Sequence, residues 1–170
     1  MGILKTPTKI VDANIWINNT HHLGTNASVK TPKIATGRTD QKVAGFTRKL
    51  STGVFEPLEG EFELLEYSPA VMEILASGTD GTDVEILIKA SLYSGGKKIP
   101  YVALWKGLAE VEDGELKAGE DVSRKVKMDL HYASLTIDGY EEYRLDIDNI
   151  IGIVDGVDKL EELRKHIMKK

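Results

Sequence analysis

Apolar and polar side chains alternate over much of the chain, most clearly in its middle. Over residues 84–92 the apolar side chains occupy every second position, which indicates a strand with one buried face. Residues 94–97 supply turn chemistry, and a second strand returns over residues 99–108. The pattern therefore predicts an antiparallel hairpin. Because residues 99–104 are apolar at both phases, we expect them to be covered on both faces, by this chain or by a neighbouring subunit.

Two more strands are predicted after an acidic turn over residues 113–121. In the first, apolar residues recur at every second position from Val126 to Tyr132, and the phase then shifts to Leu135. A β-bulge near residues 133–134 would explain the shift, because one extra residue reverses the buried face. Asp138-Gly139 is a strong hairpin signal, and alternation resumes in the second strand.

The first half of the chain is less regular. Short strands are predicted over residues 13–17, 29–36 and 54–67. Between the last two lies a polar, basic, glycine-containing segment over residues 37–53, which we interpret as a long loop. A connection of that length is unusual inside a compact domain, so it is either mobile or used for contacts, and we expect contacts between subunits.

Two helices complete the predicted fold. Ser68-Pro69 is a helix start signal, and the apolar series that follows ends before Gly78. A C-terminal helix is expected over residues 157–170, with acidic residues in its first turns, basic residues in its last, and a narrow apolar stripe. The chain is thus predicted to be a single domain over residues 1–170, mainly β, with an antiparallel sandwich or barrel and two helices.

Composition narrows the function classes. The 170 residues include no cysteine, which excludes thiol catalysis, thiolate zinc sites and disulfides, and suits a reducing cytoplasm. The net charge of -5 disfavours a dedicated nucleic-acid binder. No apolar run approaches the length of a membrane span, so no membrane anchor is expected.

The charge is unevenly distributed. Residues 1–49 hold eight basic against two acidic residues, whereas residues 110–155 hold thirteen acidic against five basic. In a monomer this is a polarised surface, but in a self-assembling protein the two regions could meet across a repeated interface. The candidate subunit-interface residues are Arg38, Lys42, Arg48, Lys49, Glu110, Glu112, Asp113, Asp146 and Asp148.

Catalytic signatures are absent from the sequence. There is no glycine-rich phosphate loop, nucleophile elbow or zinc-protease motif. His21-His22 is interpreted as a polar loop and not as a metal site, since adjacent strand residues point to opposite faces. Asp146 and Asp148 share a predicted strand face, which we interpret as solvated. We expect no enzyme activity, no cofactor and no metal.

Several segments in the second half carry a family resemblance. They are residues 105–108, 110–111, 114, 116–120, 132, 135, 138–139, 143–149, 156–160 and 163–164, and upstream residues 14–19 and 31–34 extend the match. In order and spacing these segments resemble the P2-type major tail tube proteins of contractile phage tails, which also occur in R-type pyocins. Residues 37–53 match poorly, and the terminal Lys169-Lys170 departs from the family pattern.

The resemblance implies a β-barrel-like subunit that closes into hexameric rings, which stack inside a contractile sheath. Its partners would be further copies of itself, the sheath protein, and the baseplate or tail-tip and tape-measure proteins. DNA would pass in transit through the host envelope. The protein would belong to the virion tail and assemble in the cytoplasm of a bacterial host. Two alternatives stay open: the tube of a related contractile secretion or injection system, and a soluble β-sandwich module that binds carbohydrate or peptide.

Overall fold

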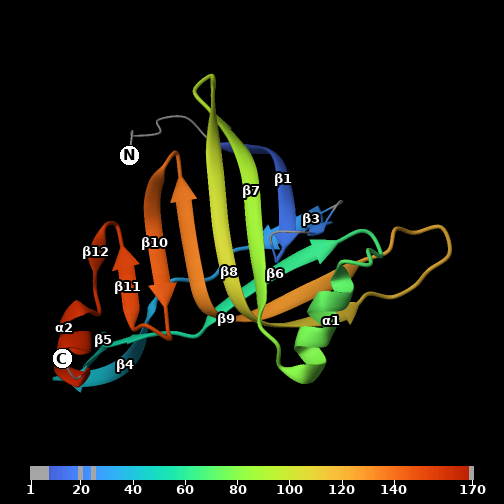
Figure 1. The fold of residues 1–170 in the computed structure, drawn as a ribbon. Helices are drawn as coiled ribbons and strands as arrows, with labels where there is room; N and C mark the ends of the chain where they lie inside the picture. The colour runs from blue at the N-terminus through green and yellow to red at the C-terminus, as the bar shows by residue number, and fades with distance from the viewer. Residues whose placement is uncertain (1–7, 19–20, 24–25, 169–170) are drawn as a thin grey trace.

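A large antiparallel sheet dominates the computed structural model, which describes residues 8–18, 21–23 and 26–168 (Figure 1). Ten strands form this sheet, and two more form a separate hairpin. The sheet comprises β1 (Lys9–Ile17), β2 (His21–Leu23), β3 (Asn26–Lys30), β6 (Leu58–Leu64), β7 (Val84–Ser94), β8 (Lys97–Asp113), β9 (Arg124–Ile137), β10 (Tyr140–Asp146), β11 (Ile151–Val154) and β12 (Val157–Asp158). The prediction of a mainly β, antiparallel fold with two helices is confirmed.

Strand β9 organises the sheet by changing its partner along its length. The main order is β12-β11-β10-β9-β8-β7-β1-β2, while β6 pairs with β9 and β3 pairs with β6. The first half of β9, up to Leu130, pairs with β6, and the second half, from Tyr132, pairs with β10. In Figure 1, β6 and the start of β9 cross obliquely beneath β7 and β8, so the sheet folds over on itself.

A β-bulge marks the point where β9 changes partner. Lys106 pairs with Tyr132 and Gly107 with Leu130, so His131 is the extra residue. The carbonyl of His131 accepts a hydrogen bond from the amide of Ile147 at 2.9 Å. The bulge predicted near residues 133–134 therefore exists but lies earlier, and it leaves Tyr132 off the buried face. The bulge was placed too late because tyrosine, with an apolar ring and a polar hydroxyl, suits either the buried or the exposed face of a strand.

The hydrophobic core lies in the fold between the two parts of the sheet. The fully buried side chains of the strands come from β1, β6, β7, β8 and β9, and Trp105 and Phe62 are the largest of them. Helix α1 (Val71–Asp80) closes one end and contributes Val71 and Ile74. The alternation that predicted β7 and β8 therefore arises because alternate side chains of these strands are buried in this core.

Helix α1 differs in detail from its prediction. It begins at Val71, and Ser68 instead forms the preceding turn, where its Oγ accepts a hydrogen bond from the amide of Ala70. It also runs past Gly78 to Asp80. Gly78 lies against β8, where a Cβ would come within 2.9 Å of the carbonyl oxygen of Ala109. That glycine therefore allows close packing of helix on strand and does not end the helix.

The segment predicted as a long loop over residues 37–53 is a β-hairpin, which corrects that prediction. Strands β4 (Thr36–Val43) and β5 (Phe46–Phe55) pair with each other, and Ala44 and Gly45 have φ of 47° and 84°. Two left-handed residues form the tight turn that matches strand twist. The signal was missed because Ala-Gly is a weaker turn motif than Asn-Gly and because the strands are mostly polar.

The C-terminal helix is shorter than predicted. Helix α2 (Glu161–Ile167) follows the short strand β12, so residues 157–158 are not helical. None of the α2 residues is buried, and the expected apolar stripe is exposed at Leu163 and Ile167. Lys169 and Lys170 lie outside the described residues. Among the described helices, none is long and apolar enough to cross a membrane.

Candidate assembly surfaces

The hairpin β4–β5 carries four of the predicted interface residues on two different faces. Its register places Asp40 opposite Lys49 and Lys42 opposite Thr47, so Arg38, Lys42 and Lys49 share one side, the basic face. The other side, the apolar face, holds Val43, Phe46 and Leu50 together with Arg48.

The exposure of the apolar face is unusual for a free protein. Phe46 is 80% exposed and Val43 47% exposed at the tip of the hairpin. Arg48 donates a hydrogen bond from Nε to Oε1 of Gln41 at 2.7 Å, which holds its side chain along this face. Clustered exposed apolar groups typically mark a surface that another protein covers.

The predicted acidic residues of β8 are neutralised in part within the subunit. Glu112 lies 3.0 Å from Lys127, and Asp113 lies 2.5 Å from Arg124. The hydrogen bond from Lys127 lowers the pKa of the Glu112 carboxyl, and the hydrogen bond from Arg124 lowers that of Asp113. These two carboxylates are therefore charged at neutral pH, but each already has a basic partner.

Asp146 and Asp148 do not form a pair on one strand face. Strand β10 ends at Asp146, and Asp148 lies in the turn that follows. Asp146 accepts hydrogen bonds from the amide of Asn149 at 3.1 Å and from its side chain at 2.7 Å. Burial alone raises the pKa of Asp146, but these hydrogen bonds outweigh it and lower the pKa. Asp146 therefore stabilises a turn.

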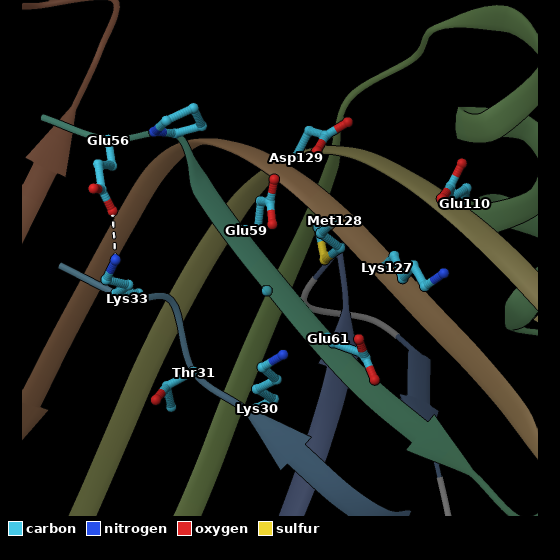
Figure 2. A pocket seen from close by; sticks show the side chains of 12 residues that line it. Lys30, Thr31, Lys33, Glu56, Glu59, Glu61, Glu110, Lys127, Met128 and Asp129 are labelled. Atoms are coloured by element: carbon cyan, nitrogen blue, oxygen red, sulfur yellow. Dashed lines mark hydrogen bonds and ion pairs between the residues drawn. The ribbon is translucent and has the colours of Figure 1, made fainter. Parts of the chain in front are cut away.

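A polar groove of about 580 Å³ crosses the outer face of β6 and β9 (Figure 2). Its lining includes five carboxylates and three lysines, listed here by charge: Glu56, Glu59, Glu61, Glu110 and Asp129; Lys30, Lys33 and Lys127. Lys33 pairs with Glu56 at 2.7 Å at one rim. The groove is thus acidic overall and open to solvent.

Among the residues that the structure describes, one edge of the sheet is open. Strand β1 pairs with β7 along its whole length, but β2 covers only its end, from Ile15. Along the uncovered part, Ile10 is 69% exposed and Val11 57% exposed. Unpaired strand edges readily accept a strand from another chain.

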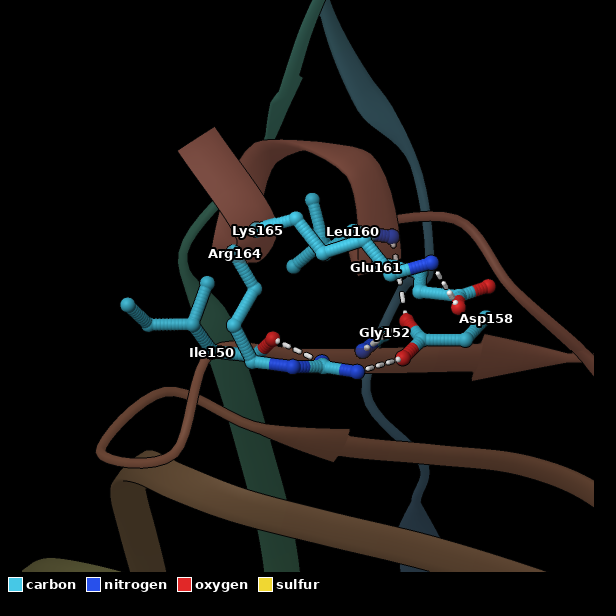
Figure 3. A network of polar contacts seen from close by, with 7 residues as sticks. All are labelled: Ile150, Gly152, Asp158, Leu160, Glu161, Arg164 and Lys165. Atoms are coloured by element: carbon cyan, nitrogen blue, oxygen red, sulfur yellow. Dashed lines mark hydrogen bonds and ion pairs between the residues drawn. The ribbon is translucent and has the colours of Figure 1, made fainter. Parts of the chain in front are cut away.

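The opposite edge is closed by the C-terminal segment (Figure 3). Arg164 donates hydrogen bonds to the carbonyl of Ile150 at 2.8 Å and to Asp158 Oδ2 at 2.7 Å. Asp158 Oδ1 accepts from the amides of Leu160 and Gly152. Burial raises the pKa of Asp158, but the hydrogen bonds from Arg164 and these amides outweigh it and lower the pKa. Polar contacts thus tie α2 to the sheet; of the predicted apolar stripe, Leu160 lies against Gly152, whereas Leu163 and Ile167 are exposed.

Among the described residues no three histidines or carboxylates gather as a metal site. His131 Nε2 lies 3.0 Å from Asp83 and its Nδ1 lies 3.3 Å from the carbonyl of Lys106, which anchors the bulge. His21 and His22 belong to β2, contrary to the predicted loop, and their side chains lie outside what is described.

Three features of these surfaces were not found from the sequence. They are the facing carboxylates Glu59 and Asp129, the exposed Phe46 and the open edge at Ile10. A facing pair becomes visible only when strand register is known. Phe46 and Ile10 could have been noticed as apolar residues within polar stretches.

Comparison with known proteins supplies the family. The family of phage tail tube protein FII matches residues 7–167. The tail tube protein of Escherichia phage P2 is 28% identical over 167 residues, which cover 95% of this chain and 97% of that protein.

Two solved structures share the fold. A chain of the PVC extracellular contractile injection system sheath-tube complex has 10% identity and a TM-score of 0.54, over 78% of this chain and 93% of that chain. A chain of the PVC sheath/tube terminator has 11% identity and a TM-score of 0.53, over 78% and 99%. The resemblance noted in the sequence is thus confirmed, and the chain belongs to the phage tail tube protein FII family.

Proposed function

We propose that this chain is the structural subunit of the inner tube of a contractile phage tail or phage-tail-like particle, and that it has no enzymatic role. The match to the tail tube family over residues 7–167 carries this proposal. Its exposed apolar hairpin and open sheet edge support it, because both are unfavourable in a monomer and both are useful in an assembly.

In the proposed assembly, six subunits close into a ring. The open edge of β1, with Ile10 and Val11, offers backbone groups and apolar side chains to the adjacent subunit. An adjacent subunit that lies against this edge would cover it in every copy around the ring. A ring that closes in this way leaves no open edge, which removes the tendency of free edges to aggregate.

Rings then stack head to tail into a hollow conduit. A stacking contact joins two different surfaces of the subunit, so it does not close and produces a filament. The sheath protein would surround this tube, the baseplate or tail-tip would start it, and the tape-measure protein would occupy it during assembly. We propose that DNA passes through the lumen, and that assembly takes place in the cytoplasm of the bacterial host before the tube becomes part of the virion tail.

Electron microscopy of the purified protein over a range of concentrations tests this function. The expected result is six-membered rings at moderate concentration and hollow filaments at high concentration. Compact monomers at every concentration, also after addition of a baseplate extract, would contradict it and favour a soluble binding module. The tube of a contractile injection system would give the same particles, and is distinguished by whether DNA or protein is found in the lumen of intact particles.

A further inference from the structure

The basic face of the hairpin β4–β5 has little internal charge compensation. Arg38, Lys42 and Lys49 lie on this face, and within the part of the chain that the structure describes none of them forms an ion pair. Asp40, the acidic residue of the hairpin, lies on the same face opposite Lys49. The face therefore keeps an excess positive charge and is exposed along its length.

The groove over β6 and β9 carries an excess of negative charge, since five carboxylates and three lysines line it. Its strands align in rows, and in most rows a lysine of β9 lies between carboxylates of β6 and β8. Lys127 stands opposite both Glu61 and Glu110. Lys125 lies 3.4 Å from Glu61, and Lys127 lies 3.0 Å from Glu112. In the rows of Lys125 and Lys127, the carboxylates of the sheet therefore have basic partners within the same subunit.

One row breaks this rule. Glu59 stands directly opposite Asp129, and the next residue in that row is Leu108. Neither carboxylate forms an ion pair among the described residues, and both are exposed within the groove. Like charges directly opposite in an antiparallel pair destabilise a sheet. The free subunit thus retains an unfavourable pair where a cation would be accommodated.

We propose that the basic face of β4–β5 of one subunit docks in the groove over β6 and β9 of a subunit in the adjacent ring, and supplies the cation missing between Glu59 and Asp129. This inference rests on the proposed function and names the stacking contact within it. The partner is a second copy of this chain, because hairpin and groove carry opposite uncompensated charge.

The geometry of the subunit leaves this contact free to form. None of the residues that line the groove comes from β4 or β5, so the hairpin of the same chain does not fill it. The open edge of β1 accounts for closure of the ring, whereas the hairpin stands outside the ten-stranded sheet. Hairpin and groove are different surfaces, so their contact is heterologous and repeats from ring to ring.

Charge exchange tests the proposal. The groove variant is Glu59→Lys with Asp129→Lys, and the hairpin variant is Arg38→Glu with Lys42→Glu. A third variant combines all four changes. The control is Lys97→Glu with Lys98→Glu, which makes the same charge change as the hairpin variant at the exposed start of β8. Each variant is compared with the wild type by sedimentation and electron microscopy, and by circular dichroism to establish folding.

Each double variant should form rings but no tubes, with a critical concentration for tubes raised about tenfold or more, because like charges meet at every stacking contact. The combined variant should regain tubes, and the control should behave as wild type. The groove variant places two lysines opposite each other, so its sheet keeps a like-charge pair and its melting temperature should stay near that of the wild type.

Two results would overturn the inference while leaving the proposed function intact. One is normal tubes from both double variants. The other is failure of the combined variant to regain tubes although it folds and forms rings. Loss of rings as well as tubes in the double variants would assign the hairpin to ring closure, which also contradicts stacking. Absence of rings and tubes in the wild type would instead count against the proposed function itself.

Discussion

The junction between helix α1 and strand β8 gives a sharp test of the fold. Strand β7 begins at Val84 opposite Gly107, so β8 continues beyond the end of its neighbour. There the amide of Ala109 donates a hydrogen bond to Ser77 Oγ of α1 at 2.9 Å. Ser77 is 2% exposed and Ala109 3% exposed, so water does not replace this contact. A helix hydroxyl thus takes the place of the missing strand.

Ser77→Ala removes the acceptor and leaves the buried amide of Ala109 unpaired. An unsatisfied buried donor costs about 1–3 kcal/mol. Alanine is the better helix former and returns roughly 0.5 kcal/mol. The expected net loss in the free energy of unfolding is therefore about 0.5–2.5 kcal/mol, which corresponds to a fall in melting temperature of about 1–10 °C for a chain of this size.

Urea denaturation of the monomer at low protein concentration measures this loss, because assembly would otherwise add to the apparent stability. Thr79→Ala is the matched control in the same helix. The Thr79 hydroxyl is exposed and donates only to carbonyls of its own helix, so its removal should change stability by about 0.5 kcal/mol or less. Equal losses in the two variants, or a loss below about 0.5 kcal/mol for Ser77→Ala, would refute this account of the junction.

Three further outcomes are expected. At the bulge, a Cβ on Gly107 would overlap the carbonyl oxygen of Asp129, so Gly107→Ala should lower the yield of soluble protein and cost several kcal/mol, roughly 3 or more, in urea denaturation. Because the pKa of Asp158 is lowered in the folded protein, its ionised carboxyl stabilises the fold above the ordinary carboxyl pKa, and this stability is lost as pH falls through the pKa of the folded state. Hydrogen exchange of α2 should therefore accelerate below about pH 4, and Asp158→Asn should remove that pH dependence. Burial raises the pKa of Tyr143 to about 12 from 10.0, so stability should decline as pH rises between these values, and Tyr143→Phe should flatten the alkaline limb of the unfolding curve.

Long strands with one buried face were predictable because every second residue of such a strand is apolar. The alternation over residues 84–92 and the turn at Asp138-Gly139 both correspond to elements of the structure, β7 and the β9–β10 hairpin. Where burial is weak the pattern fails. Hairpin β4–β5 buries almost nothing, so its strands carried no apolar alternation and were predicted as a loop.

The candidate interface residues were also predicted only in part from the sequence. The sequence identified the basic hairpin residues and the acidic end of β8 from charge distribution alone. It could not show that Lys127 and Arg124 already neutralise Glu112 and Asp113, because those partners are joined only by strand register. That register also brings Glu59 opposite Asp129 across β6 and β9.

The sequence by itself therefore determined the class of fold, the family and the residues rich in charge, since these depend on local periodicity and on motifs read along the chain. Only the tertiary structure decided which strand edge stays open, where β9 changes partner, and which charges remain uncompensated. Those features depend on contacts between residues far apart in the chain. Glu59 and Asp129 are seventy positions apart, and nothing in the local pattern around either one specifies the other.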